Sequence, residues 1–206
     1  RVKTNFGEIE QKFQIDQHKN IVLDSKNQEF LEQINQNQKN LMIGEPGAGK
    51  SWFLTNFIEY LEEINISVIR HYCFTGTEDN LNEQRVLSDV FFGNLISTLL
   101  KKFPKIRKEK ESLLAASLKE LNLLLSKIDS PLIIIIDGLD HIERTLKTST
   151  SLSQERTRII NDISQVEINK NISIILSSQP VNEVNPLIDN YSFIKICFTF
   201  SFCTFF

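Results

Sequence analysis

The sequence predicts a three-layer α/β fold built on a five-stranded, mainly parallel sheet. Short apolar runs rich in β-branched residues alternate along the chain with longer segments of helical spacing. These runs carry apolar side chains on both faces, which is typical of strands buried under helices on both sides. The chain has 206 residues, enough for one such domain and too few for two of ordinary size.

The predicted strands share Ile, Val, Leu and aromatic residues at consecutive positions. They are Leu41–Ile43, Ser67–Phe74, Leu132–Ile136, Ile172–Leu176 and Phe193–Phe200. Apolar residues spaced i, i+3 and i+4 predict the helices that lie before and between them. These are Leu23–Ile34, Ser51–Ile64, Leu81–Phe103, Leu113–Ile128 and Glu155–Ile168.

Local composition divides the chain into three parts. Residues 1–19 are polar without a sustained period, which predicts an N-terminal segment or the remnant of a linker. Residues 20–198 hold nearly all the predicted elements and are expected to form one domain. Residues 199–206 continue without charge or turn signal, so we expect a hydrophobic tail that extends the sheet edge or results from truncation.

The overall composition disfavours several classes of protein. A net charge of −3 with 41% hydrophobic residues is typical of a folded domain and disfavours nucleic-acid binding by bulk positive charge. Three cysteines without a C-x-x-C pair disfavour a disulfide framework or a zinc site, and predict a reducing, cytoplasmic location. No apolar run approaches the roughly 20 residues of a membrane helix, so no membrane partner is expected. The basic stretch Lys101–Lys110 is interpreted as a solvated helix end, with a phosphate or nucleic-acid contact as the alternative.

Residues 44–51 match the pattern G-x-x-x-x-G-K-[ST] directly after a predicted strand and before an amphipathic helix. Glycines let the backbone curl around phosphate oxygens, and successive N–H groups then face the anion at the positive end of the helix. Lys50 is expected to reach the β and γ phosphates of ATP or ADP and to assist catalysis, and Ser51 to ligate Mg²⁺. The predicted nucleotide-binding residues are Gly44, Glu45, Pro46, Gly47, Ala48, Gly49, Lys50, Ser51 and Trp52. The fold class thereby becomes the three-layer P-loop NTPase fold, with a ligand-free glycine turn as the alternative.

Asp137 is the second element of the predicted site, because it follows the most apolar run in the chain. A Mg-nucleotide site needs a carboxylate at the end of a neighbouring strand to hold the metal through its water shell. We therefore assign Asp137 to the metal. An aspartate after a strand can also serve as a turn former, which is the alternative interpretation.

A carboxylate that orients the attacking water is expected near the metal ligand. Many ATPases of this kind place Glu immediately after the metal aspartate, whereas this chain has Gly138 there. Asp140 is the next carboxylate and is our candidate catalytic residue, with His141 and Glu143 as weaker candidates. The alternative role of Asp140 is the N-cap of a helix that begins near His141.

Polar residues at the tips of the other strands are expected near the γ phosphate. The candidates at the end of the strand Ile172–Leu176 are Ser177, Ser178 and Gln179. Arg70, His71 and Arg144 are predicted to meet the nucleotide or a neighbouring subunit, with packing or surface roles as the alternative.

These motifs together resemble the STAND class of signal-transduction P-loop ATPases. The Asp-Gly-Leu-Asp turn at 137–140 is similar to the NACHT branch, and residues 70–74 followed by 91–95 resemble large bacterial antiphage ATPases. The resemblance implies a defence switch that is closed with ADP and oligomeric with ATP. It also implies that Lys50 and Ser51 bind phosphate and magnesium, and that Asp140 acts in catalysis. Many relatives carry Arg where this chain has Gln179.

Four functions follow from these observations. The leading one is the ATP-binding and slowly hydrolysing core of a STAND-type switch, which forms a homo-oligomer when activated in a longer protein. A module that binds nucleotide without turnover and an AAA+-like ATPase acting on nucleic acid are the alternatives, and a small-molecule kinase is more remote. The charge of −3 disfavours the nucleic-acid role.

Overall fold

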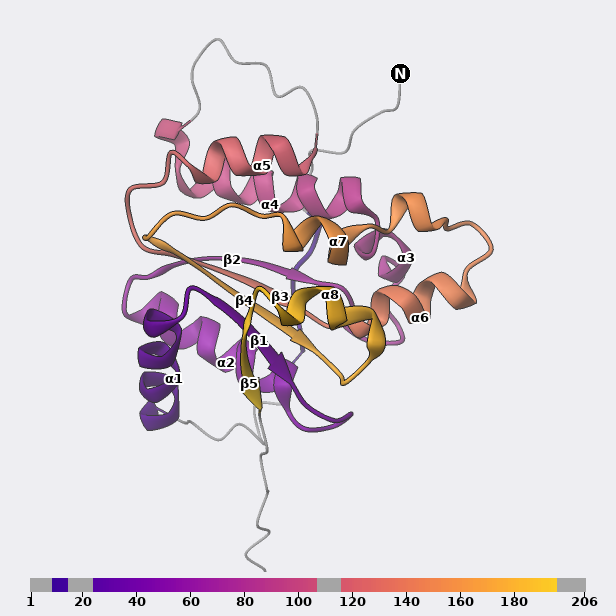
Figure 1. The fold of residues 1–206 in the computed structure, drawn as a ribbon, viewed down its shortest axis with the longest axis horizontal. Coiled ribbons are helices and arrows are strands. Elements are labelled where there is room, and N and C mark those ends of the chain that lie inside the picture. The colour runs from indigo at the N-terminus through magenta and orange to yellow at the C-terminus, as the bar shows by residue number, and fades with distance from the viewer. Residues whose placement is uncertain (1–8, 15–23, 107–115, 196–206) are drawn as a thin grey trace, which may run out of the picture.

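The computed structural model of the chain describes residues 9–14, 24–106 and 116–195 (Figure 1). Its centre is one five-stranded sheet with the strand order β2-β3-β4-β1-β5. Every pair of neighbouring strands is parallel, which confirms the predicted fold class. The strands are β1 (Lys39–Ile43), β2 (Ser67–Tyr72), β3 (Leu132–Asp137), β4 (Ile172–Ser178) and β5 (Ser192–Lys195).

Helices cover both faces of the sheet, as Figure 1 shows. One face carries α1 (Asp24–Gln36) and α2 (Lys50–Glu63). Helices packed on the other face include α4 (Ser88–Lys102), α5 (Leu118–Leu125), α6 (Asp140–Thr148), α7 (Ile159–Ser164) and α8 (Asn185–Ile188). No helix in the described ranges combines the length and the apolar character needed to cross a bilayer.

The apolar character of the strands on both faces follows from this layering. In β3, Ile133 and Ile135 pack under α1 and α2, whereas Leu132, Ile134 and Ile136 belong to the larger core cluster on the opposite face. All of them are buried. Because successive side chains of a strand point to opposite faces, a run of isoleucines stabilises both layers at once.

The predicted helix Leu81–Phe103 is two helices in the structure. A four-residue helix, α3 (Asn82–Arg85), is followed by Leu87 in an extended conformation, and α4 begins at Ser88. The Arg85 carbonyl accepts a hydrogen bond from Nε2 of His71 at 2.8 Å. A buried side chain thus takes the carbonyl that a continuous helix would use, which sequence periodicity does not reveal.

Two other predicted helices are shorter in the structure, and the predicted fifth strand lies only partly within the described residues. The predicted helix Glu155–Ile168 is helical only over α7, preceded by a 3₁₀ turn at Gln154–Arg156. For the predicted helix Leu113–Ile128 the structure shows α5, and residues 113–115 lie outside the described residues. The fifth strand is described as β5, and residues 196–206, including the predicted tail, also lie outside them.

Residues 9–14 lie along β2, the outermost strand on one side of the sheet. The Tyr72 backbone N–H donates to Oε1 of Gln11 at 2.7 Å, and Nη2 of Arg85 donates to the Glu10 carbonyl at 2.7 Å. These contacts occupy a sheet edge that would otherwise expose its backbone groups. The division of the chain at residue 19 stays a prediction.

Candidate active site

The loop between β1 and α2 has the backbone geometry that its glycines permit. Gly49 has φ 81°, in the left-handed region that favours glycine, and it precedes the first residue of α2. The Phe53 N–H donates to the Gly49 carbonyl at 2.8 Å, so the helix hydrogen bonds start at the loop itself. The positive end of a 14-residue helix therefore faces the space enclosed by the loop.

Lys50 spans this loop. Its Nζ donates to the Gly44 carbonyl at 2.6 Å and to the Glu45 carbonyl at 3.1 Å. Burial lowers the pKa of Lys50, while the carboxylates of Asp140 and Asp137 oppose that shift. The ammonium group is thus held at the loop by neutral carbonyls and by the field of two carboxylates.

Asp137 ends β3 as a buried carboxylate, with 1% of its surface exposed. The Ser177 hydroxyl donates to Oδ1, and the Ser51 hydroxyl lies close enough to lower the pKa of the carboxyl. Oδ2 has no hydrogen-bond partner among the described residues. Burial raises the pKa of Asp137, and these hydroxyls and Lys50 act in the opposite direction.

The arrangement around Asp137 fits a cation that takes most of its ligands from a bound phosphate and water. In the described ranges, no cluster of three or more His, Cys, Asp or Glu residues could hold a metal by itself. Ser51 and Asp137 provide a hydroxyl and a buried carboxylate with a free oxygen. Mg²⁺ is commonly bound in this way, with one or two protein oxygens and the oxygens of a nucleotide.

The turn after β3 explains why the second carboxylate is at 140. Gly138 has φ 80°, a conformation that a glutamate would adopt only with strain. The Leu139 N–H donates to the Ser177 carbonyl at 3.0 Å, which ties the turn to β4. Asp140 then becomes the first residue of α6, and Oδ1 accepts the Gln179 backbone N–H at 3.1 Å.

Most of the predicted site residues line one pocket of about 320 Å³. The polar and loop residues in its wall are Gly47, Ala48, Gly49, Lys50, Ser51, Asp137, Gly138, Asp140, Ser177 and Gln179. Aromatic rings complete it, namely Phe13, Trp52, Phe74 and His141. Gly44, Glu45 and Pro46 are not in this wall, although the first two supply the carbonyls that bind Lys50.

Sequence reasoning missed the two phenylalanines. Phe74 stacks on His141 with ring centroids 4.0 Å apart, and Phe13 stacks on Tyr72 at 6.0 Å. Burial lowers the pKa of His141, while Asp140 opposes the shift. Phe74 follows the end of β2 and could have been found from its position, whereas no local signal marks Phe13.

His71 does not reach the pocket, and the structure supports the packing role that the sequence left open as its alternative. Its side chain points to the face covered by α4, where it is fully buried. Nε2 donates to the Arg85 carbonyl, so Nδ1 is the acceptor for the Asn94 amide at 3.3 Å. Burial lowers the pKa of His71 to about 4. His71 is a neutral core residue.

Three more predicted residues lie away from the pocket. Arg70 lies within β2, two residues before its end, and its side chain lines a separate hollow beside residues 9–11. Glu143 pairs with Lys147 at 3.4 Å on another side of α6. The Ser178 side chain is buried outside the pocket wall, since alternate residues of β4 point to opposite faces.

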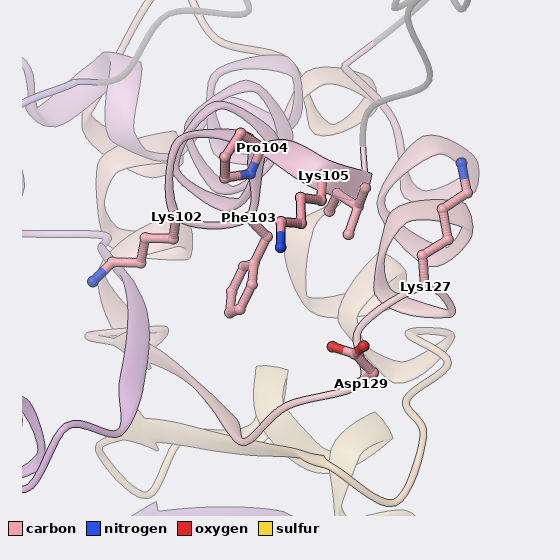
Figure 2. Close-up of a pocket in the computed structure, with 7 residues that line it drawn as sticks. Lys102, Phe103, Pro104, Lys105, Lys127 and Asp129 are labelled. Carbon is pink, nitrogen blue, oxygen red and sulfur yellow. The ribbon is translucent and has the colours of Figure 1, made fainter.

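A larger hollow, of about 440 Å³, lies at the other end of the sheet, where α4 and α5 end (Figure 2). It belongs in part to the basic stretch 101–110. Lys102, Lys105 and Lys127 surround it, with Asp129 and apolar side chains of residues 103–106. Lys102, Lys105 and Asp129 are exposed, in contrast to the buried carboxylates of the first pocket.

The family model for the N-terminal region of nephrocystin 3 matches residues 19–179, which include β1 to β4 and every residue that lines the pocket except Phe13. The chain belongs to the nephrocystin 3 N-terminal family. No curated protein matches the chain. In this family member, the match begins before α1 and ends at Gln179, at the tip of β4.

Solved structures with the same fold include the Walker-type ATPase of Pyrococcus abyssi, with TM-score 0.52 and 17% identity over 85% of this chain and 53% of that one. Cdc6p from Pyrobaculum aerophilum has TM-score 0.49 and 12% identity, covering 84% of this chain and 44% of that one. The structure of Drosophila ORC bound to DNA contains a chain with TM-score 0.48 and 14% identity, with 84% and 88% covered. This chain thus shares the α/β fold of the Walker-type ATPase of Pyrococcus abyssi and spans about half the length of the two archaeal proteins.

Proposed function

We propose that this domain binds ATP and hydrolyses it slowly, and that it is the nucleotide-dependent core of a STAND-type switch with a role in defence. The observation that carries the proposal is the convergence of the loop, Lys50, Asp137 and Asp140 on one pocket. The bound forms are ATP and ADP with Mg²⁺.

Phosphate binding rests on the loop and the start of α2. The backbone N–H groups at this helix end provide a site for the β and γ phosphates. Lys50, which donates to two loop carbonyls, would neutralise charge on those phosphates. Ser51 and Asp137 would hold Mg²⁺, which neutralises charge on the phosphates.

In the proposed hydrolysis, the second carboxylate, Asp140, acts on the attacking water. The water oxygen forms a bond to the γ phosphorus while the bond from phosphorus to the bridging oxygen breaks, giving ADP and phosphate. Asp140 is held at the pocket wall by the Gln179 N–H, and its Oδ2 has no hydrogen-bond partner among the described residues. That oxygen can orient the water and accept its proton.

The switch role extends the STAND resemblance to the longer protein. ATP binding would favour a homo-oligomer, and ADP a closed state. An AAA+-like ATPase acting on nucleic acid is the second candidate, because three lysines surround the hollow in Figure 2. Stimulation of phosphate release by single-stranded or duplex DNA with a steep salt dependence would favour that role.

The test is the affinity for ATP and ADP of the wild type and of Lys50→Ala, with phosphate release measured in the same samples. We expect loss of nucleotide binding by two orders of magnitude or more, because the variant lacks the cation that neutralises the phosphates. Lys119→Ala, in the first turn of α5, is the control and should bind as the wild type does. Equal ATP affinity for wild type and Lys50→Ala would contradict the proposal.

A further inference from the structure

Arg144 lies one helical turn after Asp140 on α6, so the two side chains share a face of the helix. Its Nη2 donates to Oε1 of Gln179 and lies 3.3 Å from Oδ2 of Asp140. Arg144 therefore contacts the candidate catalytic carboxylate and the tip of β4 at the same time. Both partners line the pocket at the phosphate loop.

Arg144 and Asp140 form an ion pair without a hydrogen bond. Asp140 has 2% of its side chain exposed, yet Oδ2 has no hydrogen bond from any described residue. The Arg144 side chain is 50% exposed, so solvent screens its attraction to the carboxylate. The guanidinium is thus placed beside the site without being locked there.

The pocket is short of positive charge for a nucleoside triphosphate. Among the described residues that line it, Lys50 is the only lysine or arginine. Arg144 lies near enough to lower the pKa of Lys50, although burial of the lysine is the larger cause. Gln179, which occupies the strand tip, is neutral. A guanidinium presents two N–H groups that match phosphate oxygens, and Arg144 is the nearby group with that chemistry.

We propose that Arg144 is the cation that binds the γ phosphate of ATP. Without a third phosphate it rests on Gln179 and Asp140. When ATP is bound it moves to a γ-phosphate oxygen, which releases Asp140 to orient the water and stabilises the charge that develops as ADP leaves. Arg144 thereby discriminates ATP from ADP and is a catalytic residue of the proposed reaction, on which this inference rests.

The experiment compares Arg144→Ala with Lys147→Ala in the full chain. Lys147 is on the same helix but pairs with Glu143 and Glu183, away from the pocket, and is 66% exposed. For each protein, the measurements are the affinity for Mg-ADP and Mg-ATP, the affinity for ADP with aluminium fluoride, and kcat for phosphate release.

We expect Arg144→Ala to keep its ADP affinity within about twofold and to lose roughly 100- to 1,000-fold in kcat, the cost of removing one such donor. Binding of ADP with aluminium fluoride should fall by a similar factor, because that complex imitates the transferring phosphate. Arg144→Lys should recover part of kcat, since an ammonium keeps the charge but not the paired donors. Lys147→Ala should match the wild type in all measurements.

The outcomes separate this inference from the proposed function. If the wild type binds and hydrolyses ATP and Arg144→Ala does so at the same rate, the role of Arg144 is overturned and the ATPase assignment stands. Equal loss of ADP and ATP affinity in Arg144→Ala would also overturn it, because that pattern reports a structural role. If the wild type and Lys50→Ala bind ATP equally, the proposed function itself fails.

Discussion

A buried histidine on β2 and two buried aspartates at and just after the end of β3 differ in how completely their hydrogen bonds are made. Both ring nitrogens of His71, on β2, have partners, from Arg85 and Asn94. Asp137 and Asp140, at and after the end of β3, each leave one carboxylate oxygen without a hydrogen bond among the described residues. Burial of an unpaired polar atom costs free energy, and a ligand bound in the pocket would supply the missing partners of these two oxygens.

The two hollows differ in the same respect. The one in Figure 2 is larger, but exposed lysines dominate its charged wall. The smaller one has buried carboxylates, a buried lysine and a helix N-terminus. Volume alone therefore does not distinguish the two hollows, whereas the buried carboxylates and lysine of the smaller one do.

The largest expected effect is on phosphate release, at one of the two aspartates that have an oxygen without a hydrogen bond. Asp140→Asn should lower phosphate release roughly 100- to 10,000-fold, because an amide cannot accept the proton of the attacking water. ATP affinity, measured by titration, should change only a few-fold. Asp129→Asn, at the hollow in Figure 2, is the matched control and should hydrolyse ATP as the wild type does. Wild-type turnover in Asp140→Asn would show that this carboxylate has no part in the reaction.

His71, whose hydrogen bonds are complete, should instead affect the pH dependence of stability. The folded-state pKa of His71 is about 4, below its ordinary value of 6.5, so the unfolded chain takes up the proton first. Its contribution to stability is full above pH 6.5 and is lost as pH falls through 4, a total of roughly 3 kcal/mol. Urea unfolding at several pH values should show a smaller loss in His71→Gln than in the wild type. The same loss in both proteins would contradict a buried neutral imidazole.

A smaller effect, of opposite sign for function and stability, is expected at Asp137. Its raised pKa means that folding disfavours the charged form. The free energy of unfolding of Asp137→Asn should therefore be about 0.5–2 kcal/mol higher than that of the wild type in the absence of nucleotide. The same variant should lose the dependence of ATP binding on Mg²⁺. Ser177→Ala removes a donor to the carboxylate and should be less stable than the wild type. Thermal unfolding measures both, and a destabilised Asp137→Asn would count against this account.

The smallest effect is expected at the three lysines around the hollow in Figure 2. Replacing Lys102, Lys105 and Lys127 by Ser together should leave phosphate release within about twofold of the wild type, because their hollow is at the opposite end of the sheet from the loop. A filter-binding assay with single-stranded DNA serves as the second measurement. Loss of turnover in this triple variant would show that the larger hollow takes part in ATP hydrolysis, contrary to the comparison of the two hollows.

Patterns local in the sequence predicted much of the molecule. The isoleucine run of β3 indicated a strand buried on both faces, and residues 44–51 indicated a loop whose shape the structure confirms at Gly49. Asp137 and Asp140 were found because they follow that strand. For His71 and Arg70 the sequence left a role at the site and a packing or surface role both open, since a position near a strand end does not tell which face a side chain takes; the structure supports the second role.

What the sequence by itself determined is the identity of the loop, the strands and the two carboxylates, because these depend on residues close together in the chain. Only the tertiary structure decided what meets them. The strand order puts β4 between β1 and β3, so Ser177 reaches Asp137 and Gln179 reaches Asp140 and Arg144. The same packing brings Phe13 to the pocket from the segment along β2. These contacts join residues tens of positions apart in the sequence. Because strand pairing sets them, no local sequence pattern predicts them.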